Sequence, residues 1–220
     1  MNISYIDEGF DAIVIDDFFT QGELELVQAE AQELTQGGQM QASSRALKSA
    51  WDERDPTHLV ARRKGIFLET VFKDWRTSNL IRVSRLALKS NQLRDQLVEH
   101  NSLFRLLFAE YAHSHLLNYY EHGDYYDWHE DSTIFTILCW FCQEPKAFTG
   151  GDFVIRNHRG LEQVVEFKNN RVLIIPSCTP HRVTPIVMPT EGAYTGLGRY
   201  SLTVFVATWP AEDNYGGGKR

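Results

Sequence analysis

The sequence predicts a mainly β protein with helices at its N-terminal end, which is an α+β fold. Two observations predict it. Apolar residues recur at helical spacing only within the first 115 residues, and from Leu116 onward short strand-like runs alternate with turn residues. Many short strands at this spacing indicate a sandwich or a barrel. With 220 residues, 43% of them hydrophobic, the chain is expected to form a single domain, residues 1–220, with a sizeable core.

The helices are expected first. Thr20 and Glu23 have the spacing of a capping box, in which each side chain satisfies a backbone amide at the helix start. The predicted helices cover residues 21–35, a stretch from about Ser78, and residues 92–113. A loop rich in Gln, Gly and Ser is expected at 36–46. Residues 1–115 are therefore interpreted as a helical support region packed on the β core, residues 116–209.

The strands are predicted from apolar and β-branched runs bounded by turn residues. They are expected at residues 11–19, 116–120, 133–142, 152–156, 163–167, 171–175, 181–187 and 199–208. Gly150-Gly151 and Lys168-Asn169-Asn170 are turn signals between them.

Three residues suggest a metal site. His129 and Asp131 lie two apart, and at a strand end this spacing puts both side chains on one face. His181 opens another predicted strand, and antiparallel pairing can bring its imidazole beside the first two. Two histidines and one carboxylate on one face of an octahedral ion form the triad of non-heme Fe(II) oxygenases, which leaves three coordination positions open.

Arg199 extends this pattern. An arginine presents a fork of donors that can grip a carboxylate at two points. A metal triad followed by such a fork suggests iron, 2-oxoglutarate and O₂. Arg182 is a second candidate for the carboxylate anchor, but as the neighbour of His181 it should point to the opposite face of the strand.

A family resemblance rests on four motifs. Residues 120–131 (YEHGDYYDWHED) resemble the Y-x-x-G-x-x-Y-x-x-H-x-D run of the prolyl 4-hydroxylase-like 2-oxoglutarate/Fe(II)-dependent oxygenases. Similar motifs follow in the family's order at 148–153 (FTGGDF), 180–183 (PHRV) and 199–203 (RYSLT). The resemblance covers residues 116–209, whereas the first 115 residues contribute only a compatible helical pattern.

The resemblance implies a double-stranded β-helix, the cupin-like jelly roll, with iron at its open end. By motif match, His129, Asp131 and His181 would ligate Fe(II), and Arg199 would anchor the distal carboxylate of 2-oxoglutarate. Ser201 lies on the same strand face as Arg199 and would add a hydroxyl donor. Tyr120 matches a tyrosine that hydrogen-bonds the cosubstrate in this family, with a core aromatic as the alternative.

The resemblance also implies a reaction. O₂ and 2-oxoglutarate would be consumed, succinate and CO₂ released, and an unactivated C–H bond hydroxylated, with ascorbate allowed as a further cofactor. Related halogenases replace the carboxylate ligand by Gly or Ala, so the presence of Asp131 favours hydroxylation. The substrate is expected to be a prolyl or other protein side chain, or a free amino acid or small metabolite. The sequence leaves this choice and the oligomeric state open.

Trp140 and the segment 187–198 have two interpretations each, and the pair Gly150-Gly151 has one. Trp140 either lines the cosubstrate pocket or packs in the core. Gly150 and Gly151 are interpreted as a structural turn. Arg199 follows His181 by 18 residues (199 − 181), a longer gap than the family usually has. The extra residues, 187–198, are interpreted as an inserted loop that is either a mobile lid or a surface insertion without a role.

Composition and charge disfavour several other classes of function. The net charge is −7, whereas nucleic-acid binding usually shows a basic surface, so a nucleic-acid demethylase is disfavoured. The apolar runs are too short to span a bilayer, and the first ten residues do not read as a signal peptide. A non-catalytic cupin-like metal-binding or sensor module is the main alternative, but such a module would not need Arg199 and Tyr120 placed around a dicarboxylate.

The cysteines and the remaining histidines are predicted to have no metal-binding or catalytic role. Cys139 and Cys142 have CxxC spacing, but on a strand they face opposite sides, so they are predicted to be buried thiols of a protein in a reducing cytoplasm. Apart from His129 and His181, the histidines are interpreted as core or surface groups without a metal: His58, His100, His113, His115, His122 and His158.

Overall fold

A computed structural model describes residues 1–7, 9–42, 55, 57–108, 112–189 and 194–207. Its helices are α1 (Gln21–Gln36), α2 (Leu68–Val71), α3 (Asn79–Leu88) and α4 (Asn91–His100), with 3₁₀ turns at Trp75–Thr77 and Ser102–Phe108. No helix in these ranges is both long enough and apolar enough to cross a bilayer.

Two antiparallel sheets form the body of the molecule. The large sheet contains, in spatial order, β1 (Asn2–Ile6), β2 (Ala12–Asp16), β12 (Arg171–Pro176), β8 (Phe135–Phe141), β15 (Arg199–Ala207), β6 (Ala112–Tyr120), β5 (Lys64–Phe67) and β3 (Gln41–Ala42). The small sheet contains β11 (Glu162–Val165), β10 (Phe153–Arg156), β13 (His181–Val183), β7 (Tyr125–His129) and β4 (Ala61–Arg62). A separate pair joins β14 (Ile186–Val187) to β9 (Thr149–Gly150).

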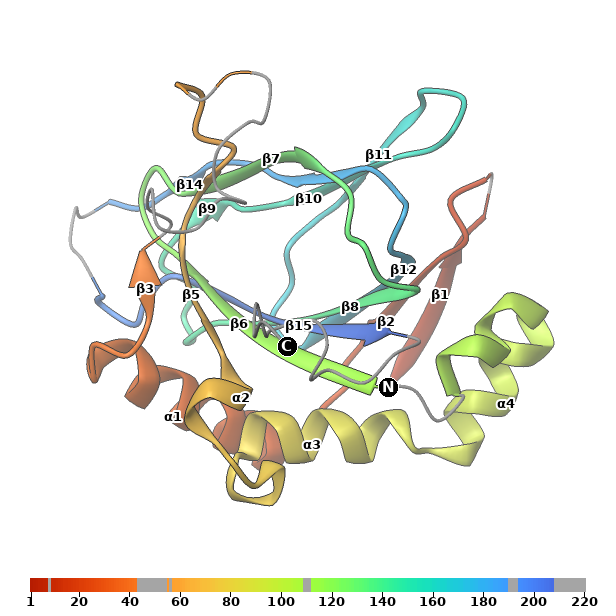
Figure 1. The fold of residues 1–220 in the computed structure, drawn as a ribbon, viewed down its shortest axis with the longest axis horizontal. Coiled ribbons are helices and arrows are strands. Elements are labelled where there is room, and N and C mark those ends of the chain that lie inside the picture. The colour runs from red at the N-terminus through yellow and green to blue at the C-terminus, as the bar shows by residue number, and fades with distance from the viewer. Residues whose placement is uncertain (8, 43–54, 56, 109–111, 190–193, 208–220) are drawn as a thin grey trace, which may run out of the picture.

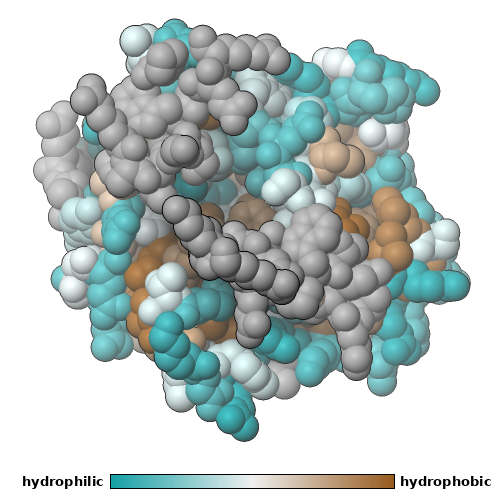
Figure 2. All heavy atoms as spheres, viewed as in Figure 1, coloured by the Kyte–Doolittle hydropathy of each residue, from teal (hydrophilic) through white to brown (hydrophobic). Residues whose placement is uncertain are grey.

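The elements lie in three layers. Figure 1 shows α1 and α3 along one side of the large sheet and the small sheet on its other side. One hydrophobic core fills the space between the helices and the large sheet, and a second core fills the space between the two sheets. Figure 2, viewed from the same side as Figure 1, shows hydrophilic side chains around the outside of the molecule and hydrophobic side chains visible between them. Because the helices share a core with the large sheet, we propose that the chain folds as one domain.

Strand alternation decides which core each side chain enters. On β15, Tyr200 and Leu202 pack toward the helices, whereas Arg199 and Ser201 face the space between the sheets. The same alternation sends Cys139 and Cys142 into different cores. Both thiols are free, and burial raises the pKa of each to about 12. The prediction of inert buried thiols is therefore confirmed.

The predicted first helix is confirmed with its cap. In α1 the Thr20 side chain accepts from the backbone N–H of Glu23, and the Glu23 carboxylate accepts from the backbone N–H of Thr20. The predicted helix near Ser78 is also present as α3, and the strand predicted at 11–19 is present as β2.

Three predictions about elements are wrong. The helix expected at 92–113 ends at His100, because Asn101 is extended and its side chain starts a new 3₁₀ turn by accepting from the N–H of Leu103. The strand expected at 181–187 is split into β13 and β14, because Pro185 has no N–H to donate to a ladder. Residues 1–115, interpreted as a helical support region, also contribute strands to both sheets: besides the predicted β2, the described part of this region contains β1, β3, β4 and β5.

Candidate metal and dicarboxylate site

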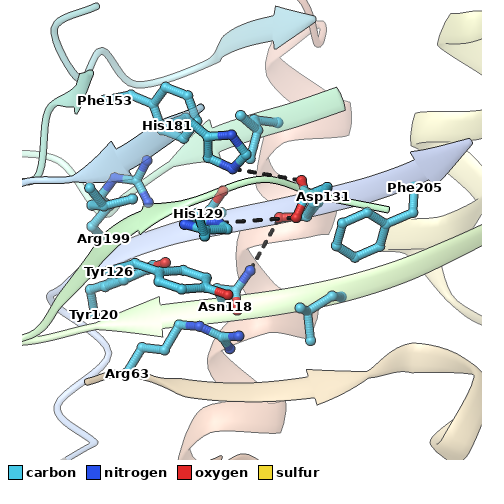
Figure 3. Close-up of a pocket in the computed structure, with 15 residues that line it drawn as sticks. Arg63, Asn118, Tyr120, Tyr126, His129, Asp131, Phe153, His181, Arg199 and Phe205 are labelled. Atoms are coloured by element: carbon cyan, nitrogen blue, oxygen red, sulfur yellow. Dashed lines mark hydrogen bonds and ion pairs between the residues drawn. The ribbon is translucent and has the colours of Figure 1, made fainter. Parts of the chain in front are cut away.

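Two strands of the small sheet bring the predicted metal ligands together. His129 is the last residue of β7 and His181 is the first residue of β13, and the two are directly opposite in the antiparallel register. Their imidazole centroids are 4.1 Å apart. Asp131 follows two residues after His129, and all three side chains converge in Figure 3.

The three side chains can hold one ion. One ligand atom from each lies within 4.8 Å of the other two. Nε2 of His129 is 4.0 Å from Oδ1 of Asp131, and Nε2 of His181 is 3.6 Å from Oδ2 of Asp131. Adjacent ligands of an octahedral ion, each bound at about 2.1 Å, lie about 3 Å apart, so small side-chain rotations would complete the geometry.

The tautomers of both histidines suit metal binding. Nδ1 of His129 is 2.8 Å from the carbonyl of Asp127, and Nδ1 of His181 is 2.8 Å from the carbonyl of Thr179. A carbonyl oxygen can only accept, so each Nδ1 carries the proton and each Nε2 presents a lone pair to the centre of the site. Burial, with smaller contributions from His181 and Arg63, lowers the pKa of His129 to about 2, which keeps its imidazole neutral.

Aromatic rings fix the planes of these imidazoles. The Tyr126 ring stacks on His129 with centroids 3.5 Å apart and planes inclined by 8°. The Phe153 ring stacks on His181 at 5.0 Å. Stacking and the Nδ1 hydrogen bonds together leave each ring little freedom to rotate, so the site is organised before any ion binds.

Arg199 lies in the same pocket, inside an aromatic cage. Its side chain is fully buried, and its guanidinium carbon is 5.1 Å from the ring centroids of Tyr120 and Trp140 and 5.4 Å from that of Phe167. Burial lowers its pKa to about 10, so the group remains charged at neutral pH. Within the part of the chain that the structure describes, none of its three nitrogen atoms has a hydrogen-bond partner.

A buried cation without a partner is costly, because the low-polarity surroundings do not replace its hydration. An anionic ligand that enters the pocket would remove this cost. The buried hydroxyl of Ser201, two residues along β15, also has no partner among the described residues. The donor set beside the triad is therefore that of a carboxylate-binding site, and these residues fit 2-oxoglutarate.

Tyr120 lines the pocket, whereas Trp140 is a core residue that is not among its lining residues; a contact of either with the cosubstrate stays a prediction. Tyr120 is paired directly with Arg199 in the register of β6 and β15 and lines the pocket, and it also belongs to the core between the sheets. Burial raises its pKa, so its hydroxyl keeps its proton as a donor. Trp140 is a core residue, as the packing interpretation predicted, and it is also one wall of the cage around Arg199.

Gly151 makes room for Arg199. Its φ of +73° is in the region that favours glycine, and an added Cβ would lie 3.0 Å from Cδ of Arg199 and overlap the Ile186 side chain. The glycine turn that the sequence predicted as structural is therefore also part of the wall behind the anchor.

Arg182 lies on the opposite face of its strand, as strand alternation predicted. Its guanidinium pairs with Glu162 at 3.7 Å and lies over the ring of Trp128. Arg199 lines the pocket and Arg182 does not, and the role of Arg199 as the anchor stays a prediction. Of the histidines interpreted as ordinary groups, none joins a metal-binding cluster within the described residues.

The pocket contains residues that the sequence did not reveal. Besides the predicted site residues, it is lined by Arg63, Asn118 and Phe205, which Figure 3 shows around the triad. The Arg63 guanidinium lies over the ring of Tyr126, 5.1 Å from its centroid. No local signal marks Arg63, because it comes from a short segment between β4 and β5 that reaches the site only in the folded chain.

The described parts of the insertion at 187–198 are held in place by hydrogen bonds and do not line the pocket. The backbone amides of Tyr194 and Thr195 donate to the buried carboxylate of Glu121, and those of Gly196 and Gly198 donate to the hydroxyl of Tyr119. None of the described residues of this segment lines the pocket. The lid function stays a prediction, which the product-to-succinate ratio of a shortened variant would test.

Comparisons with known proteins agree with this geometry. Residues 114–207 match the family model of the 2OG-Fe(II) oxygenase superfamily. The chain is 32% identical over 120 residues to a PKHD-type hydroxylase of Gloeothece citriformis, in an alignment that covers 47% of this chain and 54% of that protein. The chain thus spans about half the length of this curated relative.

Solved structures share the fold. A prolyl-4-hydroxylase of Pseudomonas putida superposes with a TM-score of 0.61 at 16% identity, covering 90% of this chain and 93% of that one. A prolyl hydroxylase of Trichoplax adhaerens, in complex with a hypoxia inducible factor peptide, superposes with a TM-score of 0.61 at 15% identity, covering 95% and 87%. The predicted double-stranded β-helix is confirmed by these likenesses.

Proposed function

We propose that the protein is a 2-oxoglutarate-dependent hydroxylase of the 2OG-Fe(II) oxygenase superfamily, whose family model residues 114–207 match. One observation carries the proposal. The fully buried guanidinium of Arg199, which has no hydrogen-bond partner among the described residues, lies in the same pocket as the His129, Asp131 and His181 cluster. A metal site alone would not require a desolvated cation beside it, whereas a metal site that binds a dicarboxylate does.

The proposed roles follow from the geometry. His129, Asp131 and His181 would hold Fe(II), and Arg199 with Ser201 would bind the distal carboxylate of 2-oxoglutarate. When bound, iron and 2-oxoglutarate supply the oxidising chemistry: one O₂ and one 2-oxoglutarate become succinate and CO₂, and one oxygen atom enters a substrate C–H bond. The aromatic cage of Arg199 would exclude water from this ion pair and so strengthen it.

The primary substrate is proposed from the remaining wall of the pocket. Arg63 and Asn118 are polar groups of the pocket lining, and Phe205 is an apolar one. This combination suits an amino-acid-like substrate, either a prolyl-type side chain in a protein or a free amino acid, whose polar backbone groups could reach Arg63 while an aliphatic part approaches the metal.

We also propose that the protein is located in the cytoplasm. The free, buried thiols of Cys139 and Cys142 are compatible with that reducing compartment.

The test is direct detection of the reaction. Purified protein with Fe(II), O₂ and 2-oxoglutarate should form succinate, and the rate should rise when peptides or amino acids that are substrates are added. Asp131→Ala should abolish this succinate formation. A non-catalytic cupin-like module, the second candidate, would bind Fe(II) without forming succinate under any of these conditions.

A further inference from the structure

Three hydroxyl groups form a chain that ends on the carboxylate of Asp131. Oγ1 of Thr136 is 2.6 Å from Oδ2 of Asp131, Oγ of Ser177 is 2.9 Å from Oγ1 of Thr136, and Oγ1 of Thr133 is 2.7 Å from Oγ of Ser177. Thr136 and Ser177 have no exposed surface. In a buried chain of this kind each hydrogen bond polarises the next, so the contacts strengthen one another.

The direction of these hydrogen bonds is determined. A metal-binding carboxylate can only accept, so Thr136 must donate its single hydroxyl proton to Asp131. Thr136 must then accept from Ser177, and Ser177 must accept from Thr133. Every proton in the hydroxyl chain therefore points toward Asp131.

The hydroxyl chain and two backbone carbonyls connect Asp131 and His181 to the same turn, residues 177–180. Thr136 lies on β8, facing the space between the sheets, and Ser177 lies in the turn that joins β12 to β13. The carbonyl of Ser177 accepts from the backbone N–H of Asp131, and the carbonyl of Thr179 in the same turn accepts from Nδ1 of His181. Residues 177–180 thus orient two ligands that come from different parts of the chain.

We propose that this hydroxyl chain is a positioning device that holds Asp131 as a one-oxygen ligand of the metal. The proton of Thr136 occupies Oδ2 and disfavours binding of the metal through both carboxylate oxygens. Oδ1, which is 4.0 Å from Nε2 of His129, would then bind the metal, while Oδ2, 3.6 Å from Nε2 of His181, would keep its hydrogen bond to Thr136. The inference rests on the metal site of the proposed function, but it concerns how that site is held rather than the reaction.

The experiment uses Co(II) as the probe, because its visible absorption reports coordination number without turnover. Thr136→Val removes the hydroxyl and keeps the shape, whereas Thr136→Ser keeps the hydroxyl. We expect Thr136→Val to bind Co(II) about tenfold more weakly, as is usual for groups that orient metal ligands, with a changed absorption spectrum. Thr136→Ser should retain the affinity and spectrum of the unaltered protein.

A matched control separates positioning from general destabilisation. Thr35 on α1 is equally buried and its hydroxyl donates to the carbonyl of Ala31, far from the ligands in the fold. Thr35→Val should lower thermal stability and leave Co(II) affinity and spectrum unchanged. Should Thr136→Val fail to fold, Ser177→Ala decides, because it interrupts the chain one step further from the metal and should still shift the spectrum.

The possible failures are distinguishable. If Asp131→Ala binds Co(II) as tightly as the unaltered protein, the metal site of the proposed function is wrong. If Asp131→Ala is defective but Thr136→Val and Ser177→Ala show unchanged affinity and spectrum, only the positioning device is refuted. A Thr136→Ser variant as defective as Thr136→Val would also refute it, because the methyl group rather than the hydroxyl would then matter.

Discussion

Replacing Arg199 by Met would remove a charge and all its donors while keeping an unbranched side chain that still fills the aromatic cage. The cage holds the guanidinium at 5.1–5.4 Å from three rings, with no exposed surface and no partner for its nitrogen atoms among the described residues. The change therefore isolates the electrostatic role of Arg199 from its packing.

The magnitude follows from burial. Breaking a buried ion pair by removing one partner costs about 3–5 kcal/mol, and each 1.4 kcal/mol is about a factor of ten in affinity. Ser201 would still offer one hydroxyl to the cosubstrate, so we expect 2-oxoglutarate to bind about 100-fold more weakly, and at least about tenfold. Metal affinity should not change, because Arg199 is not a ligand of the cluster.

In the absence of 2-oxoglutarate, the same substitution should stabilise the folded protein. The substitution then removes a buried charge that has no hydrogen-bond partner among the described residues, so Arg199→Met should unfold at a higher temperature than the unaltered protein. The assay is titration of the Mn(II)-loaded protein with 2-oxoglutarate by calorimetry, together with thermal melting with and without this ligand.

Arg182→Met is the matched control. Arg182 lies on the outer face of β13 against Trp128 and Glu162, so its loss should not alter 2-oxoglutarate affinity. An unchanged affinity in Arg199→Met, with a defect in Arg182→Met instead, would move the anchor to Arg182. A lower melting temperature of ligand-free Arg199→Met would show that the guanidinium stabilises the fold, and would refute the reasoning from an unpaired charge.

Three further predictions concern Fe(II) binding, stability at low pH and hydroxylation of the primary substrate. His181→Ala should abolish tight Fe(II) binding and turnover while circular dichroism shows a folded protein, and retained full iron binding would contradict the triad. Burial lowers the pKa of His113 to about 4, below the value of about 6.5 in an unfolded chain, so between these pH values the unfolded state binds the extra proton and stability falls as pH falls. Urea unfolding at pH 7 and pH 5 should show that His113→Phe loses less free energy of unfolding on acidification than the unaltered protein, by up to about 1.4 kcal/mol per pH unit. An identical loss in both proteins would show that His113 does not cause the acid sensitivity. Arg63→Gln should lower hydroxylated product relative to succinate with little change in 2-oxoglutarate affinity, whereas Arg62→Gln, exposed and paired with Asp124, should change neither; equal ratios in both variants would remove Arg63 from the substrate site.

The sequence by itself determined the features that depend on local periodicity. The spacing of His129 and Asp131 puts both on one face because strand residues alternate, and the same alternation separates Arg199 from Tyr200 and Arg182 from His181. The start of α1 was predictable because the capping box is a contact between residues three apart.

Tertiary structure alone decided the features that depend on register and packing between distant segments. The pairing of His181 with His129, the cage around Arg199 and the placement of Arg63 over Tyr126 each join segments far apart in the chain. The hydroxyl chain on Asp131 belongs to the same class, because isolated Ser and Thr residues carry no periodic signal. Hydrophobic period fixes which face a side chain occupies, but only the register of strands and the packing of layers fixes what that face meets.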